Sequence, residues 1–142
     1  MSKKTHRRYQ AVEFGPLPVE AINRALGTEL EPGDVRLSAT AHRHMAEDHP
    51  DDYEACMAAL PLAIANPTFV GQAPKHQRNF EIVRRVARPD GWAVLVGIGL
   101  ERNEFGNYAI KSSYLISAEK LDNRRRSGTL RQVVMTVVLQ ND

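Results

Sequence analysis

The stretch that decides the fold is Phe80-Glu81-Ile82-Val83-Arg84-Arg85-Val86-Ala87-Arg88-Pro89-Asp90-Gly91-Trp92-Ala93-Val94-Leu95-Val96-Gly97-Ile98-Gly99-Leu100. Two runs rich in Val and Ile flank Asp90-Gly91, a dipeptide that favours the tight turn of a β-hairpin. The pattern predicts strands over 80–87 and 92–100, paired as an antiparallel hairpin. Further extended segments follow the same pattern at 68–70, 108–116 and 130–139, and residues 103–107 form a turn.

The segments ahead of this hairpin have helical signals. Pro18 fits the first turn of a helix that runs to Leu26 and stops at Gly27. After a short extended piece at 35–37, Ser38 is a good N-cap for a second helix, which should end near His49 because Pro50 follows. A third helix should start at Pro50, break or kink at Pro61, and end at Asn66-Pro67.

Helices followed by a run of strands predict an α+β fold, with N-terminal helices packed on a mainly antiparallel sheet of about four strands. We expect residues 1–15 to form a mobile basic arm and residues 16–139 to form a single domain. The 142 residues are 42% hydrophobic and 25% charged, which is typical of one globular domain. We find no signal peptide and no apolar run of the roughly 20 residues that a membrane helix needs, and Cys56 is the only cysteine. These features predict a cytoplasmic protein without membrane contact.

The net charge is only +2, but the basic residues are clustered. Clustering of this kind is typical of proteins that bind polyanions, although each cluster alone could be a solvated surface. One cluster lies in the N-terminal arm, and the other two comprise Lys75, Arg78, Arg84, Arg85 and Arg88, then Lys120, Arg124, Arg125, Arg126 and Arg131. Together the last two favour nucleic acid as a partner.

Three histidines lie close together in the predicted second helix. Residues seven apart on a helix point in nearly the same direction, so His42 and His49 share a face while His44 points elsewhere. Histidine is the side chain best suited to proton transfer near neutral pH. The spacing lacks the pattern of helical zinc ligands, and therefore we predict no metal and no cofactor. The structural alternative is one buried, hydrogen-bonded histidine with exposed neighbours.

The predicted strand over 108–116 carries a second candidate group. Strict alternation puts Tyr108, Ser112 and Tyr114 on the core face and Lys111 with Ser113 on a more open face, where a lysine beside a hydroxyl can bind phosphate. Arg84 and Arg85 project to opposite sides of their strand, so at most one shares a surface with Lys111. The polar loop that carries Lys75, His76 and Arg78 could contact a phosphate backbone or be an ordinary surface loop.

From about residue 35 to residue 128 the chain resembles the phage-encoded branch of the barnase, EndoU, colicin and RelE nuclease superfamily. The resemblance rests on His44-Met45-Ala46-Glu47-Asp48-His49-Pro50, on Asn66-Pro67 further along, and on Lys111-Ser112-Ser113-Tyr114. Asp48 and Ser113 depart from the family pattern, which often has a basic residue and a threonine there, and His42 is an additional histidine. The helix geometry pairs His42 with His49, whereas the resemblance pairs His44 with His49.

This resemblance implies a metal-independent endoribonuclease of prophage origin, often a toxin with a neutralising immunity or antitoxin protein. His49 with His44 or His42 would then transfer protons, and Lys111, Ser113 and Tyr114 would complete the catalytic group. The residues expected to bind phosphate and RNA are Lys75, Arg78, Arg84, Arg85 and Arg125. The alternative is an inactive phage module on the same fold that binds nucleic acid or protein.

Overall fold

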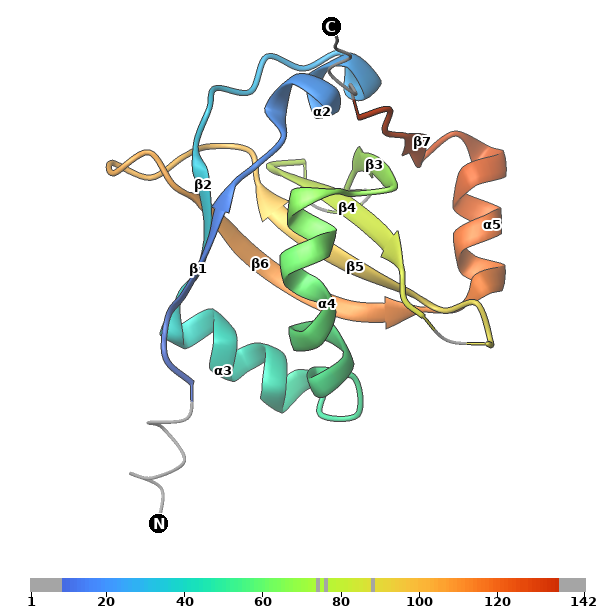
Figure 1. The fold of residues 1–142 in the computed structure, drawn as a ribbon, viewed down its shortest axis with the longest axis horizontal. Coiled ribbons are helices and arrows are strands. Elements are labelled where there is room, and N and C mark those ends of the chain that lie inside the picture. The colour runs from blue at the N-terminus through green and yellow to red at the C-terminus, as the bar shows by residue number, and fades with distance from the viewer. Residues whose placement is uncertain (1–8, 74, 76, 88, 136–142) are drawn as a thin grey trace, which may run out of the picture.

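The computed structural model describes residues 9–73, 75, 77–87 and 89–135. In this part of the chain, four helices surround one mixed sheet of seven strands, which makes the fold α+β (Figure 1). The predicted class is therefore confirmed, but the expected number of about four strands is too small. The elements in order are β1 (Val12–Pro16), α2 (Val19–Leu26), β2 (Asp34–Leu37), α3 (Ala39–Asp48), α4 (Tyr53–Ala65), β3 (Phe69–Gln72), β4 (Asn79–Arg85), β5 (Ala93–Gly99), β6 (Tyr108–Ile116), α5 (Ala118–Ser127) and β7 (Arg131–Gln132).

The predicted hairpin forms the centre of the sheet, whose strand order is β1-β2-β6-β5-β4-β3-β7. Strands β4, β5 and β6 pair antiparallel through hairpins, and β3 and β7 extend the sheet on the β4 side. The strands that lie outside this run of hairpins come mainly from the N-terminal half of the chain. There, β2 pairs in parallel with β6 at Val35–Tyr108, and β1 pairs antiparallel with β2.

Several predicted boundaries need correction. Strand β1 lies within the segment expected to be a mobile arm, because Val12 and Phe14 contact the main core. Helix α4 begins at Tyr53 rather than Pro50, since the preceding residues form a turn in which the Asp52 amide donates to the His49 carbonyl. The same helix continues through Pro61, and the buried residues on either side of this proline hold it against the sheet. Within the predicted last strand only Arg131–Gln132 pair, and residues 136–139 lie outside the described part.

Helix α5 was not predicted at all. The sequence contains its capping signals: the Ser117 hydroxyl accepts a hydrogen bond from the Lys120 amide, and Gly128 ends the helix in the left-handed conformation at φ 83°. However, Leu121 is its only buried residue, so the helix lacks the apolar periodicity that marks an amphipathic helix.

The sheet has two different faces. Helices α2, α3 and α4 cover one face, which we call the α4 face, and side chains such as Ile22, Met45 and Leu60 pack there against Val96 and Ile98. The opposite face, which we call the α5 face, has a smaller apolar cluster at one end. Its members are Phe69, Val83, Ala93, Leu95, Ile116, Leu121 and Leu130. The rest of the α5 face is polar.

No helix in the described residues is long and apolar enough to cross a membrane.

Candidate functional site

His42, one of the predicted proton-transfer residues, is buried and hydrogen-bonded. Its side chain is only 4% exposed, and both ring nitrogens have partners. Nδ1 lies 2.8 Å from the Gln10 carbonyl and Nε2 lies 2.7 Å from the Tyr53 hydroxyl. Because a carbonyl only accepts, Nδ1 carries the proton and donates it to Gln10. The ring also packs between Tyr9 and Tyr53 and so joins the N-terminal segment to α4.

The other two histidines of α3 are in different environments. His44 is exposed. His49 is the C-cap of α3, where its amide donates to the Met45 carbonyl, and its ring stacks on Tyr114 with 5.2 Å between ring centroids. The neighbouring turn is also attached to β6, because the Leu115 amide donates to the Asp52 carboxylate at 3.1 Å. His49 is therefore the histidine held beside the strand that carries Lys111.

A β-bulge in β6 changes which hydroxyl accompanies Lys111. Gly97 pairs with Ser112 but Ile98 pairs with Ile110, so Lys111 is the extra residue. A bulge shifts the alternation of side chains, and from Ser112 onward the faces are reversed relative to the prediction. Ser113 is 1% exposed and packs on the α4 face, where its hydroxyl contacts the Cys56 thiol. Ser112, rather than Ser113, lies on the α5 face with Tyr114.

Two glycines of β5 make room for these side chains on the α5 face. A Cβ atom at Gly97 would lie 2.8 Å from the Ser112 Oγ, and a Cβ at Gly99 would lie 3.2 Å from the Lys111 Cε. The lysine stem thus crosses Gly99, and the serine hydroxyl covers part of Gly97. Strand β5 consequently contributes a floor without side chains between β4 and β6.

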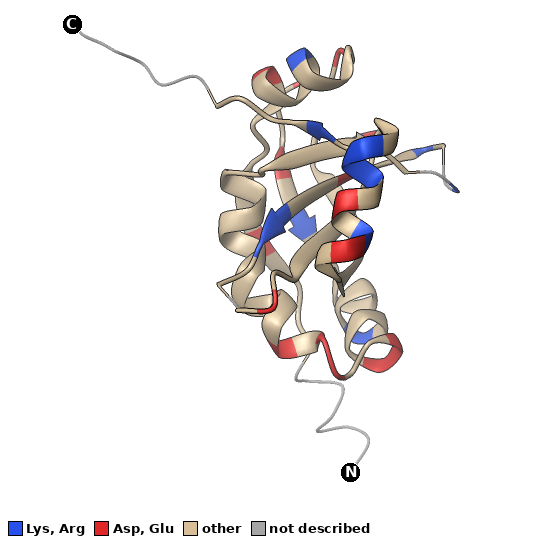
Figure 2. Cartoon of the chain, turned by 90° about the vertical axis from the view of Figure 1, so that its right-hand side faces the viewer, with Lys and Arg blue, Asp and Glu red and all other residues tan. Residues whose placement is uncertain are grey.

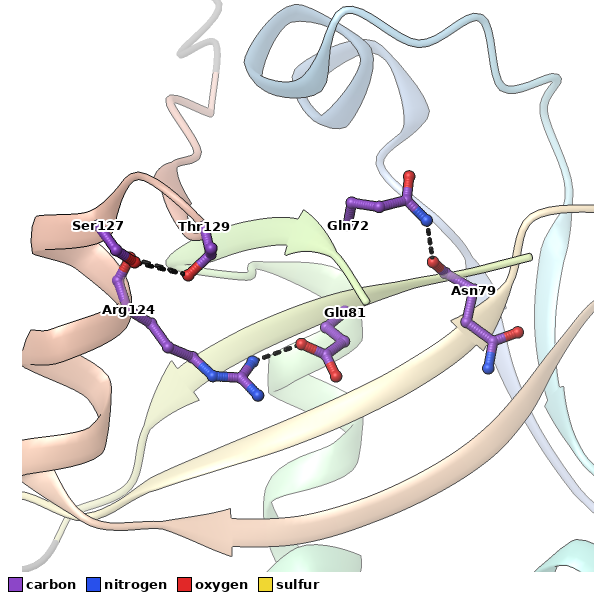
Figure 3. Close-up of polar contacts among 6 residues, drawn as sticks. All are labelled: Gln72, Asn79, Glu81, Arg124, Ser127 and Thr129. Carbon is purple, nitrogen blue, oxygen red and sulfur yellow. Dashed lines mark hydrogen bonds and ion pairs between the residues drawn. The ribbon is translucent and has the colours of Figure 1, made fainter. Parts of the chain in front are cut away.

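Glu81 faces this floor from β4, opposite Ser112. The register aligns Glu81, Gly97 and Ser112 in one row across three strands, which separates the outer two Cα atoms by about 10 Å. The Glu81 carboxylate accepts a hydrogen bond from the Arg124 guanidinium of α5 at 2.5 Å, although the residue is only 7% exposed (Figure 3).

The C-terminal end of α5 holds Arg124 in position. The Arg124 carbonyl accepts hydrogen bonds from the amides of Thr129 and Leu130 and from the hydroxyls of Ser127 and Thr129 (Figure 3). The returning chain passes directly over β3 at Gly71, where a Cβ would lie 2.0 Å from the Thr129 carbonyl oxygen. Gly71 thus permits the close approach that brings Arg124 to Glu81.

Tyr114 connects His49 to the ion pair. Burial raises the pKa of the Tyr114 phenol, the Glu81 carboxylate raises it further, and Arg124 opposes the shift. The phenol is thus close enough to sense both charges while its ring stacks on His49. We refer to Glu81, Gly97, Ser112, Tyr114 and Arg124 as the Gly97 site, with His49 and Lys111 at its margins.

The residues expected to bind RNA are distributed over several surfaces. Lys75 and Arg78 are exposed on the loop between β3 and β4. As predicted, Arg84 and Arg85 project to opposite sides: Arg84 donates to the Asn66 carbonyl beside α4, whereas Arg85 lies 3.9 Å from Asp122 of α5. Arg125 covers the Phe69 ring at 4.6 Å. His76, Arg88 and the basic residues of the N-terminal arm lie outside the described residues.

The sequence interpretation missed Glu81 and Arg124. Glu81 was only part of the predicted strand over 80–87, and Arg124 was only one member of a basic cluster. One signal was present, because Glu81 is the only charged residue among the apolar residues that begin its strand. Figure 2 shows a continuous basic stretch at one end of α5, where Arg124, Arg125 and Arg126 form its last turn, and one further basic segment between two acidic ones toward the other end.

Among the described residues, no three His, Cys, Asp or Glu side chains lie close enough together to hold a metal ion. Protein-family models, curated proteins and solved structures provide no match to this chain.

Proposed function

We propose that the chain cleaves RNA at the Gly97 site by attack of the substrate's own 2′-hydroxyl. One observation carries this proposal: the buried Glu81 carboxylate, paired with Arg124, lies beside a tyrosine that stacks on a histidine, next to a glycine of β5. The space over Gly97 is bounded by an acceptor on one side and a hydroxyl donor on the other. A phosphodiester placed there meets groups that can take a proton, give a proton and bind negative charge.

In the proposed reaction the Glu81 carboxylate takes the proton of the 2′-hydroxyl. The 2′-oxygen forms a bond to phosphorus while the bond to the 5′-oxygen breaks, and protonated His49 gives its proton to the leaving oxygen. The products are a 2′,3′-cyclic phosphate and a 5′-hydroxyl. Positioned acids and bases typically contribute about 10² to 10⁴-fold each. This scheme uses Glu81 in place of the second histidine, because both ring nitrogens of His42 are already hydrogen-bonded and His44, the other expected partner of His49, is exposed.

Positive charge and hydrogen-bond donors stabilise the transition state in this scheme. Arg124 is the nearest cation to Glu81, and Lys111 lies on the same face one row further along. The Ser112 hydroxyl can donate to a phosphate oxygen over Gly97. The raised pKa of Tyr114 keeps its phenol protonated, so it remains a donor. Fixed donors aimed at developing charge are usually the largest single contribution to catalysis.

A second candidate is an RNA-binding module without catalysis. The closed pair between Glu81 and Arg124 favours it, because the carboxylate is already occupied by the guanidinium and would have to be released before it could take a proton. The basic last turn of α5 would then bind the phosphate backbone, with an affinity that falls steeply with salt. The family resemblance adds the expectation of a neutralising partner protein to either candidate.

The test is cleavage of single-stranded RNA in the presence of EDTA by the chain and by two matched variants, His49→Gln and His44→Gln. Both histidines belong to the same helix region, but only His49 stacks on Tyr114. We expect a 2′,3′-cyclic phosphate product, a bell-shaped pH profile, and a loss of at least about 100-fold in His49→Gln alone.

Salt-sensitive RNA binding without cleavage at any pH would establish the binding module instead. Equal cleavage by all three proteins would remove His49 from the mechanism, and strict dependence on a divalent ion would reject the mechanism.

A further inference from the structure

The α5 face continues past the Gly97 site to a second position, above Gly99. In this row Asn79 of β4 pairs with Gly99 of β5, and the Lys111 stem crosses Gly99 from β6. Figure 3 shows that Asn79 and Glu81 project from β4 on the same side of the sheet. An amide and an ammonium therefore flank a glycine, as Glu81 and Ser112 do in the neighbouring row.

Asn79 is held in place through its backbone, while its side chain has no structural role in the described residues. The Asn79 carbonyl accepts from the Gln72 side chain at 2.6 Å and from the Ala73 amide at 3.3 Å (Figure 3). The Gln72 side chain also donates to the Gln77 carbonyl, which closes the loop between β3 and β4. Within the described part of the chain the Asn79 amide group makes no hydrogen bond, so its donor is available to a ligand.

We infer that Asn79 and Lys111 form a second phosphate subsite over Gly99, adjacent to the Gly97 site. This inference rests on the proposed function, because it assigns the subsite to the phosphate that neighbours the cleaved one. The groups that border the position favour an anion: Lys111 is exposed and supplies a full positive charge, the Asn79 amide supplies a neutral donor, and the acidic Glu81 is occupied by Arg124. Gly99 itself is buried beneath the Lys111 stem, so the ligand would be bound by the ends of the Asn79 and Lys111 side chains.

A second phosphate subsite makes a specific demand on the substrate. A dinucleoside monophosphate fills only the Gly97 site, whereas the same molecule with one extra terminal phosphate also fills the position over Gly99. The subsite lies on one side of the Gly97 site. Only one of the two terminal phosphates, 5′ or 3′, should therefore increase the affinity of the dinucleotide. One additional charge-assisted hydrogen bond should increase the binding affinity about tenfold or more.

The experiment measures binding of 2′-deoxy dinucleotides in all base combinations, with no terminal phosphate, a 5′-phosphate or a 3′-phosphate. These probes cannot be cleaved by 2′-hydroxyl attack, so binding is measured independently of catalysis. The chain is compared with Asn79→Ala, with Lys111→Gln, and with Gln77→Ala as the matched control. Gln77 is an exposed amide in the same loop, and its carbonyl rather than its side chain makes the loop contact. Thermal unfolding verifies that each variant is folded.

We expect about tenfold tighter binding with one terminal phosphate, loss of that gain in Asn79→Ala and Lys111→Gln, and retention of it in Gln77→Ala. Retention of the gain in Asn79→Ala, or the absence of any gain in the unmodified chain, would overturn the subsite. If Asn79→Ala instead loses affinity in a way that depends on the base and not on the terminal phosphate, the subsite is also overturned, and Asn79 binds a base. Failure of the proposed function is distinguished by a different result, which is the absence of cleavage of the corresponding ribonucleotides despite normal binding.

Discussion

Strand β5 shows the contrast between the two faces of the sheet within seven residues. On the α4 face it presents Val94, Val96 and Ile98, all of which are fully buried. On the α5 face it presents Leu95, and then Gly97 and Gly99. The first set contributes a continuous apolar core. The second set contributes one core residue and then two glycines, which are covered by the polar side chains of Ser112 and Lys111.

This difference separates stability from chemistry along a single strand. Helix α5 covers only the end of its face, where Leu121 and Leu130 pack in the cluster with Leu95, and beyond that end the polar groups of the Gly97 site replace side-chain packing. Substitutions on the α4 face should therefore change the free energy of unfolding, whereas substitutions on the α5 face should change cleavage and binding.

The largest effect on cleavage is expected from Glu81→Gln. The amide keeps the volume of the side chain and can still accept from Arg124, but it cannot take a proton, so single-turnover cleavage should fall by about 10² to 10⁴-fold. Glu119→Gln, an exposed acid in the first turn of α5, is the control and should retain activity. A folded Glu81→Gln protein with full activity would show that another group is the base.

The largest effect on stability is expected from Ile98→Ala on the opposite face. Ile98 is fully buried, and truncation of such a residue typically costs about 2 to 5 kcal/mol in the free energy of unfolding. Gly99→Ala is the neighbouring control, because its Cβ would meet the flexible Lys111 stem at 3.2 Å and the Ala109 carbonyl oxygen only at an ordinary contact distance of 4.0 Å. Urea unfolding measures both proteins, and equal losses of stability in the two would contradict the division between the faces.

A smaller but more selective effect is expected from Gly97→Ala. The added methyl group enters the centre of the site and displaces the Ser112 hydroxyl, so cleavage should fall by about 100-fold. The displaced atom is the end of a side chain that can rotate, so the change in the free energy of unfolding should stay within about 1 kcal/mol. Unchanged cleavage by this variant would mean that the phosphodiester is not bound over Gly97.

The smallest effect is a loss of stability at alkaline pH. Burial raises the pKa of both Tyr108 on the α4 face and Tyr114 on the α5 face, so the fold favours their protonated forms. Their contribution is complete below the ordinary tyrosine pKa of about 10 and is lost as the pH rises through the folded-state value. Tyr108→Phe and Tyr114→Phe should each reduce this alkaline loss in thermal unfolding, but only Tyr114→Phe should also lower cleavage.

The central hairpin and the cap of α3 could be predicted because their signals are local. Asp90-Gly91 specifies the turn between β4 and β5, and the Ser38 hydroxyl accepts from the Ala41 amide as its position suggests. Helix α5 was not predicted because nearly all of its side chains are polar. Its capping residues were the only evidence in the sequence.

The composition of the site depends on non-local structure and so could not be predicted in full. The bulge at Lys111 requires the glycines of the neighbouring strand, and without it simple alternation selects Ser113 instead of Ser112. The pair between Glu81 and Arg124 joins residues 43 positions apart through a helix that the pattern did not reveal. His49 is different, since Pro50 fixes the end of α3 and thus the place of the histidine.

The parallel pairing of β2 with β6 has a consequence for the order of folding. It joins Val35 to Tyr108 across about half of the chain, whereas β4, β5 and β6 are connected by hairpins. Contacts between distant segments close slowly because the entropy of a long loop must be lost first. We therefore expect the α5 face to assemble early from the C-terminal half and His49 to reach Tyr114 last, with the docking of the N-terminal half. The residue that we propose as the proton donor would then be the last part of the site to form.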